Sequence, residues 1–185
     1  MSKIHSNTNF YKQLESSLST STEEQRKIWA NKIIEENISI ADISDLLKCE
    51  YKIASRFLWL VGRIGMSNPN KLLPELPYLL KVCNQINPTY KTSFANFWLM
   101  AGVPVENECE AIDLLFKRLL SKETNVTIKS RSLYVLFKLS KKYPEIKNEL
   151  KFCIEDQMEK YSNDFKKKSI KILRELSDKP ADIHR

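Results

Sequence analysis

One leucine recurs along the chain at a nearly constant interval, and this regularity limits the folds that the sequence can adopt. Leu60, Leu99, Leu136 and Leu173 are separated by 39, 37 and 37 residues. Each lies in a stretch whose apolar residues recur at helical spacing. An interval of this length that accommodates two helices is typical of a helical solenoid, in which each helix pair buries its apolar face against the next pair. The spacing therefore predicts a series of helical hairpins.

The residues around this leucine show how the helices are turned. In the two later copies the i, i+3, i+4, i+7 pattern of an amphipathic helix falls at Ser132, Val135, Leu136 and Leu139, and again at Ser169, Ile172, Leu173 and Leu176. The two earlier copies carry a Trp-Leu pair, at Trp59 and Trp98. If all four copies are turned alike, both tryptophans pack in the core. The alternative is that Trp59 is partly exposed among cations, because it shares a helix face with Arg56 and Arg63.

Proline positions and apolar periodicity together predict the helix boundaries. We expect helices near residues 50–65, 70–84, 88–101, 106–120, 126–141, 144–160 and 163–177. A proline opens every second one, where its missing N–H costs nothing, at Pro69, Pro104 and Pro144. Pro74 and Pro77 cannot both lie inside a straight helix, so residues 69–84 are predicted to kink or break near Leu73.

The first 48 residues are less regular and are predicted to form cap helices at the start of the array. Ser21 and Glu24 fit a capping box before a helix that carries Trp29, and Ser39 and Asp42 repeat this start signal for a further short helix. We expect residues 50–177 to form the repeats and residues 178–185 a tail. Together, residues 1–185 are predicted to form a single domain.

Two short phrases resemble those of the HEAT-repeat family, and more loosely of the armadillo-like folds. The run from Pro69 to Leu80 is similar to the first helix of such a repeat, and Ser130-Arg131-Ser132-Leu133 resembles the start of its second helix. The resemblance covers about residues 50–177 and implies an all-α fold, a right-handed α-α superhelix of about four to five helical hairpins. It implies that the second helices line the inner face. Members of the family serve as scaffolds, transport receptors, enzyme regulators and occasionally nucleic-acid enzymes, so the resemblance specifies fold more than function.

Composition argues against several function classes. Because the sequence has only three glycines, it contains no glycine-rich phosphate loop, and its four cysteines lack the spacing of zinc ligands. The two histidines, His5 and His184, lie near the ends of the chain, so the usual catalytic base is missing from its interior. A cluster of carboxylates lies in the first turns of a predicted helix, where negative charge interacts favourably with the helix dipole. Its members are Glu106, Glu108, Glu110 and Asp113. We expect a non-enzymatic, cytoplasmic protein without cofactor, metal site, signal peptide or membrane span.

Basic residues suggest where a partner binds. The net charge is −1 over residues 1–116 and +8 over residues 117–185. The predicted binding surface is the inner face of the solenoid, and it comprises Lys52, Arg56, Trp59, Arg63, Lys91, Trp98, Lys129, Arg131, Lys138, Lys167, Lys171 and Arg174. We predict a protein-binding or scaffold module, monomeric or weakly homodimeric, with a protein or peptide partner. The alternative is nucleic-acid binding by the basic C-terminal helices, in a form like that of the alkylation-repair proteins.

Overall fold

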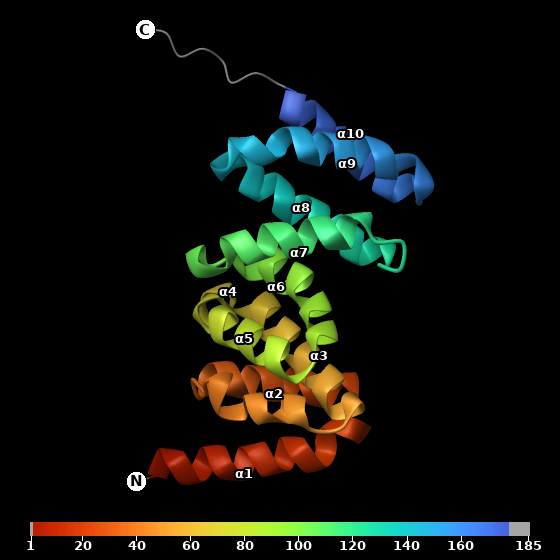
Figure 1. Ribbon diagram of the computed structural model, residues 1–185. Helices are drawn as coiled ribbons and strands as arrows, with labels where there is room; N and C mark the ends of the chain where they lie inside the picture. The colour runs from red at the N-terminus through yellow and green to blue at the C-terminus, as the bar shows by residue number, and fades with distance from the viewer. Residues whose placement is uncertain (1, 178–185) are drawn as a thin grey trace, which may run out of the picture. The chain divides into compact units, whose positions relative to one another are not determined.

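The computed structural model describes residues 2–177, and the side chains of residues 9–177. Over these residues the chain is built from α-helices and 3-10 helices, and no strand occurs among them (Figure 1). The all-α prediction is therefore confirmed. His184 and the predicted tail at 178–185 lie outside the described residues, as does the side chain of His5.

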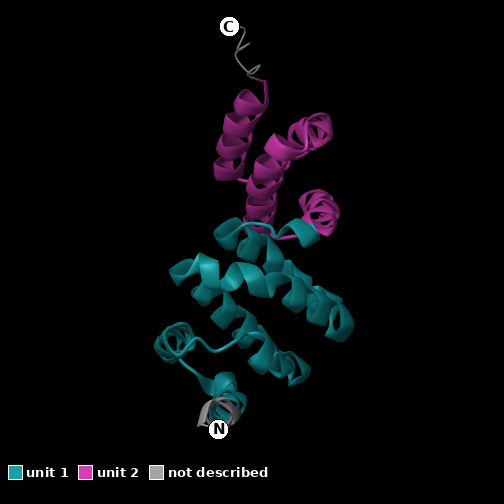
Figure 2. Cartoon of the chain, turned by 90° about the vertical axis from the view of Figure 1, so that its left-hand side faces the viewer, with its two compact units in different colours: residues 1–107 teal, residues 108–185 magenta. Residues whose placement is uncertain are grey.

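The chain divides into two compact units, residues 1–107 and residues 108–185 (Figure 2). The first unit contains α1 (Ser2–Ser17), η1 (Leu18–Thr20), α2 (Glu23–Glu35), η2 (Ala41–Lys48), α3 (Tyr51–Ser67), α4 (Pro69–Leu72), η3 (Leu73–Glu75), α5 (Leu76–Ile86), η4 (Pro88–Ser93), α6 (Phe94–Ala101) and η5 (Val105–Asn107). The second contains α7 (Glu108–Leu120), α8 (Val126–Lys142), η6 (Pro144–Ile146), α9 (Lys147–Gln157), η7 (Met158–Lys160) and α10 (Asn163–Ser177). That the whole chain forms a single domain stays a prediction.

The start of α2 differs by one residue from the prediction. The N-cap is Thr22, whose hydroxyl accepts the backbone N–H of Gln25, while the Gln25 side chain accepts the N–H of Thr22. The predicted capping box at Ser21 and Glu24 is therefore wrong. Ser21 is buried and its hydroxyl donates to the carbonyl of Leu18, so it closes the preceding turn instead of opening the helix.

The predicted break near Leu73 is confirmed. One α-helical turn begins at Pro69 and is followed by the 3-10 turn η3, after which α5 begins at Leu76. The break follows from Pro74 and Pro77, which lack the N–H that a continuous helix needs. The Asn68 side chain caps the first turn by accepting the N–H of Lys71.

Apolar side chains from α3, α5 and α6 fill the core of the first unit. Phe57, Phe94 and Phe97 are almost completely buried there. Gly65 permits a close approach between α3 and α4, because a Cβ at this position would lie 2.5 Å from Cδ2 of Leu72. This packing fixes the rotation of α3 and so decides which of its residues face outward.

Consecutive helices of the second unit pack against one another. The helices α7 and α8 form a hairpin, α9 packs on both of them, and α10 packs on α8 and α9. The predicted core positions Val135, Leu136, Phe165 and Ile172 are buried. Ser132 and Ser169, which occupy equivalent places in α8 and α10, are fully buried as well. Their small size allows close helix contact.

Candidate functional site

The outward face of α3 carries a row of basic, aromatic and thioether side chains. Lys52, Arg56, Trp59 and Arg63 follow the predicted spacing, and Met66 continues it. We call these five residues the α3 stripe. Lys52 and Met66 are exposed, whereas Arg56, Trp59 and Arg63 are half-buried. At 1.5 Å per residue the stripe extends over about 21 Å.

The indole of Trp59 lies against two guanidinium groups. The Cζ of Arg26, which comes from α2, lies 4.6 Å from the ring centroid, and the Cζ of Arg63 lies 5.9 Å from it. Both distances fall within the range of cation–π attraction. Arg63 also directs its Nη1 toward the sulfur of Met66 at 3.7 Å. The alternative prediction, a partly exposed Trp59 among cations, describes this arrangement.

Arg56 and Arg26 meet at one carbonyl oxygen. The Nη1 of Arg56 donates to the carbonyls of Leu18 at 2.8 Å and Ser21 at 2.9 Å, and the Nη1 of Arg26 donates to the same Ser21 carbonyl at 2.6 Å. These carbonyls belong to the turn that follows α1, where a helix end favours cations. Burial, and next the charge of Arg56, lower the pKa of the Arg26 guanidinium from its ordinary value. Two cations are thus held side by side.

Glu23 is the acidic residue whose charge acts on Arg26, but it forms no close ion pair with it among the described residues. Among residues 9–177, no acidic side chain forms an ion pair with Arg26, Arg56 or Arg63. The Nε of Arg26 is buried and has no acceptor among the same residues. Arg26 and Arg63 beside the indole of Trp59, with Arg56 next to Arg26 at the Ser21 carbonyl, therefore form a partly buried cationic cluster that remains able to bind an anion.

Two residues of the predicted surface are buried and cannot contribute to it. Trp98 is 1% exposed and its ring lies 5.2 Å from that of Phe94, because α6 turns its aromatic side chains into the core. Lys129 is 0% exposed. Its Nζ donates to the carbonyl of Leu119, at the end of α7, and lies 4.8 Å above the Tyr161 ring. Both residues are structural, and their inclusion in the binding surface was wrong.

The other predicted residues lie on three elements. Lys91 is half-buried in η4, and on α8 Arg131 is half-buried while Lys138 is exposed. Lys167, Lys171 and Arg174 form an exposed row on α10, which we call the α10 stripe. A hollow of about 520 Å³ opens along the α10 stripe, with Ile170 and Glu175 also lining it.

The lysines beside the α10 stripe are neutralised. Lys166 pairs with Glu159 at 2.7 Å and Lys168 pairs with Asp164 at 2.5 Å. No such pair forms with the three stripe residues in the described part of the chain. The free charge of α10 is thus concentrated on one face.

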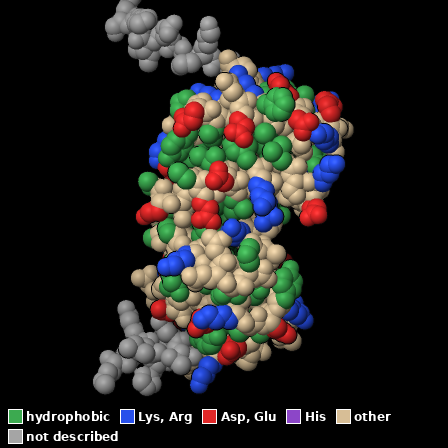
Figure 3. All heavy atoms as spheres, viewed as in Figure 1, with side chains coloured by type: hydrophobic (Ala, Val, Ile, Leu, Met, Phe, Trp, Pro, Cys, Tyr) green, Lys and Arg blue, Asp and Glu red, His purple; other side chains and the backbone are tan. Residues whose placement is uncertain are grey.

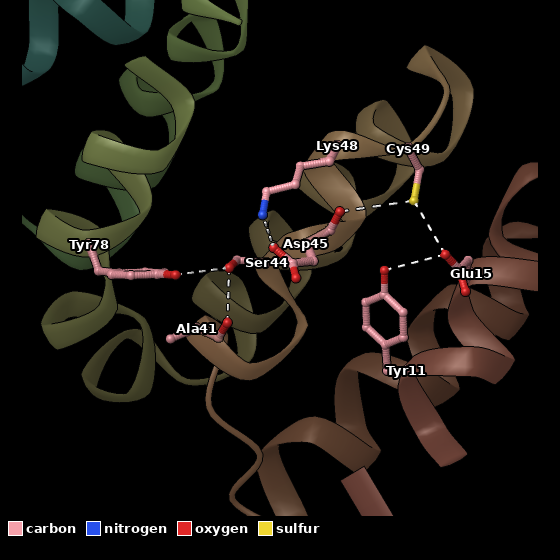
Figure 4. Close-up of polar contacts among 8 residues, drawn as sticks. All are labelled: Tyr11, Glu15, Ala41, Ser44, Asp45, Lys48, Cys49 and Tyr78. Atoms are coloured by element: carbon pink, nitrogen blue, oxygen red, sulfur yellow. Dashed lines mark hydrogen bonds and ion pairs between the residues drawn. The ribbon is translucent and has the colours of Figure 1, made fainter. Parts of the chain in front are cut away.

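Cys49 follows η2 and makes polar contacts with α1 (Figure 4). The Cys49 sulfur points toward Glu15 at 3.8 Å, and the Tyr11 hydroxyl donates to the same carboxylate at 3.4 Å. Burial and nearby negative charge raise the pKa of the Cys49 thiol, and burial raises the pKa of Tyr11 to about 12. A thiol held in its neutral form is a poor nucleophile. The described residues also contain no group of three side chains able to hold a metal ion.

Sequence reasoning missed Arg26 and Met66. Met66 was within reach, because it lies three residues after Arg63 and continues the same helical face. Arg26 carried no such signal. It meets Trp59 only through the packing of α2 against α3, two helices that periodicity alone does not orient relative to each other.

The order of helices and the leucine register define a class, the all-α proteins built from consecutive helical hairpins. A family model described as a HEAT repeat domain matches residues 12–176. The chain therefore belongs to the HEAT repeat family. Comparisons with curated proteins and with solved structures found no match. None of the described helices is long and apolar enough to cross a membrane.

Proposed function

We propose that this protein is a non-enzymatic protein-binding module and that its principal contact surface is the α3 stripe. The observation that carries the proposal is the half-buried Trp59 held between arginines on an outward helix face. Tryptophan and arginine dominate binding energy at protein interfaces when they are clustered and partly desolvated. The HEAT repeat family supports the same class of function, since its repeats typically mediate protein interactions.

The distribution of charge adds support for a protein partner. On the face drawn in Figure 3, lysine and arginine side chains are interspersed with acidic and hydrophobic ones. A surface of mixed character suits a protein interface, whose centre is less charged than its rim. A nucleic-acid backbone is better matched by a continuous cationic field.

Site-specific photo-crosslinking tests this surface. A benzophenone side chain is placed at position 52 or 66, the exposed ends of the stripe, and at Lys81, an exposed residue of α5, as the matched control. In native lysate we expect the same protein to be crosslinked from both stripe positions and not from position 81. Arg63→Glu should abolish those crosslinks. Equal capture from position 81, or capture that is insensitive to Arg63→Glu, would refute the surface.

A second candidate function, nucleic-acid binding, is favoured by the α10 stripe. Its three cations are exposed and free of ion pairs among the described residues. Cations of this kind would release counterions from a phosphate backbone, so binding to a DNA or RNA duplex should weaken steeply between low and moderate salt. Lys167→Glu with Lys171→Glu should remove this binding, whereas Lys117→Glu, an exposed change on α7, should not. No duplex binding at low salt would eliminate the candidate.

A further inference from the structure

We propose that the α3 stripe together with Arg26 recognises an acidic amphipathic helix of the partner protein, with two carboxylates seven residues apart and an apolar side chain between them. This inference rests on the proposed protein-binding function and specifies the chemistry of the partner. Neither Arg26 nor Met66 belongs to the surface expected from sequence. Both are essential to the recognition described below.

Arg26 and Arg56 carry positive charge that no close ion pair balances among the described residues. Arg26 and Arg56 donate to the same carbonyl oxygen of Ser21, which fixes two guanidinium groups next to each other. No acidic side chain among residues 9–177 pairs with either of them. Like charges that are partly withdrawn from water repel each other, and an incoming carboxylate relieves that repulsion while it forms charge-assisted hydrogen bonds. The cluster therefore selects an anionic ligand.

The spacing of the two arginines along α3 matches that of carboxylates on a partner helix. Arg56 and Arg63 are seven residues apart on one helix face, which corresponds to about 10.5 Å at 1.5 Å per residue. Two carboxylates at positions i and i+7 of a partner helix have the same separation, so the two helices can align their charges in register. Trp59 lies between the two arginines in the stripe and meets the residue between the two carboxylates.

The α3 stripe also has an apolar component. Trp59 is half-buried and Met66 is 61% exposed, although thioethers are usually buried. Exposed methionine is a feature of surfaces that accept an apolar side chain from a partner helix. Phosphate backbones offer no such group to bury here. A helix with leucine between two glutamates matches both the cationic and the apolar parts.

Binding of designed helical peptides to the full chain tests the proposal. The probe peptide carries glutamates at i and i+7 and leucine at i+3 and i+4. Its comparison peptide has the same composition with the glutamates on opposite helix faces. Binding is followed through the change in tryptophan emission, which reports on Trp59 because Trp29 and Trp98 are buried and out of contact with a bound peptide. We expect the in-register peptide to bind about tenfold more tightly than the comparison peptide and to weaken as salt is added.

Substitutions at Arg63 and at a control position test whether Arg63 contacts the probe peptide. Arg63→Glu should weaken binding of the probe peptide about tenfold or more, because it exchanges one attraction for a repulsion. Arg63→Gln, which removes charge alone, should have a smaller effect in the same direction. Lys81→Glu, the matched charge reversal on α5, should leave the affinity unchanged. Thermal unfolding of each variant checks that the fold is retained, which we expect because Arg63 donates to no backbone carbonyl among the described residues.

Several outcomes would overturn the inference. Equal affinity for the two peptides contradicts the register, and an Arg63→Glu variant that binds as tightly as wild type contradicts the site. A nucleic-acid duplex that binds more tightly than the probe peptide, with the same sensitivity to Arg63→Glu, would assign the cluster to phosphate. If the peptides fail while photo-crosslinking still captures a protein at the stripe, the partner chemistry is wrong and the proposed function stands. If both fail, the proposed function fails as well.

Discussion

The Nζ of Lys142, in the last turn of α8, lies 2.5 Å from Oε2 of Glu108, the first residue of α7. The hydroxyl of Tyr143 donates to the same oxygen. Only 8% of the Glu108 side chain is exposed, whereas 52% of that of Lys142 is. A buried carboxylate thus ties the beginning of one helix to the end of the next.

Because of this contact, the stability of the protein should depend on pH. Burial raises the pKa of Glu108, but the hydrogen bonds from Lys142 and Tyr143 outweigh burial and hold the pKa below its ordinary value. A depressed pKa contributes stability above the unfolded value of about 4.3 and loses it as the pH falls through the folded value. We expect Glu108→Gln to lower the free energy of unfolding by about 1 kcal/mol at neutral pH. The difference from wild type should shrink toward zero below the folded pKa.

Denaturant titrations at neutral pH and at about pH 3 measure this difference, because the two conditions bracket the ordinary glutamate pKa. Glu106→Gln serves as the control, since Glu106 is exposed in η5 and should leave stability unchanged at both values. If the loss of unfolding free energy in Glu108→Gln is the same at both pH values, packing and not ionisation accounts for the effect.

Lys129 is predicted to stabilise the α7–α8 hairpin from the inside. Its ammonium group donates to the Leu119 carbonyl at the end of α7 and is fully buried. Lys129→Met keeps the aliphatic stem but leaves that carbonyl without its donor, so the free energy of unfolding should fall by about 1–3 kcal/mol. Lys138→Met, an exposed change on the same helix, should alter stability by less than about 0.5 kcal/mol. Chemical denaturation compares the two, and equal effects would contradict the structural role.

The residues of this hairpin show what a sequence of this kind can and cannot predict. The predicted ranges 126–141 and 163–177 match α8 and α10 almost residue for residue, because local periodicity and flanking turns determine where a helix begins and ends. Lys129 was assigned to the surface by its charge. It lies three residues before Ser132, on the buried face, so the periodicity was the better guide.

The candidate site was harder to predict than the helices. The α3 stripe follows from spacing on one helix, and Arg56, Trp59 and Arg63 are half-buried there. Arg26 joins them through the packing of α2, and Trp98 leaves the surface because α6 is turned toward the core. Rotation of one helix against another depends on tertiary contacts that a single sequence does not display.

Two glycines of α3 provide a test of its packing. A Cβ at Gly65 would lie 2.5 Å from Leu72 and 3.2 Å from Met100, so Gly65→Ala should lower the free energy of unfolding by about 1–3 kcal/mol. At Gly62 the nearest atom would be 3.4 Å away, on Asn96. Gly62→Ala should therefore raise stability by up to about 1 kcal/mol, because alanine favours the helix. Thermal unfolding compares the melting temperatures of the two variants with that of wild type. The packing described for α3 is wrong if both variants change the melting temperature in the same direction.

The position of the α2 cap can be resolved by a pair of alanine substitutions. The Thr22 hydroxyl accepts the N–H of Gln25, so Thr22→Ala leaves that donor unpaired and should lower the free energy of unfolding by about 1 kcal/mol. Glu24→Ala removes only an exposed ion pair with Lys27 and should change stability by less than about 0.5 kcal/mol. Urea titration of both variants distinguishes the cap in the structure from the one expected at Ser21 and Glu24. A larger loss for Glu24→Ala would favour the latter.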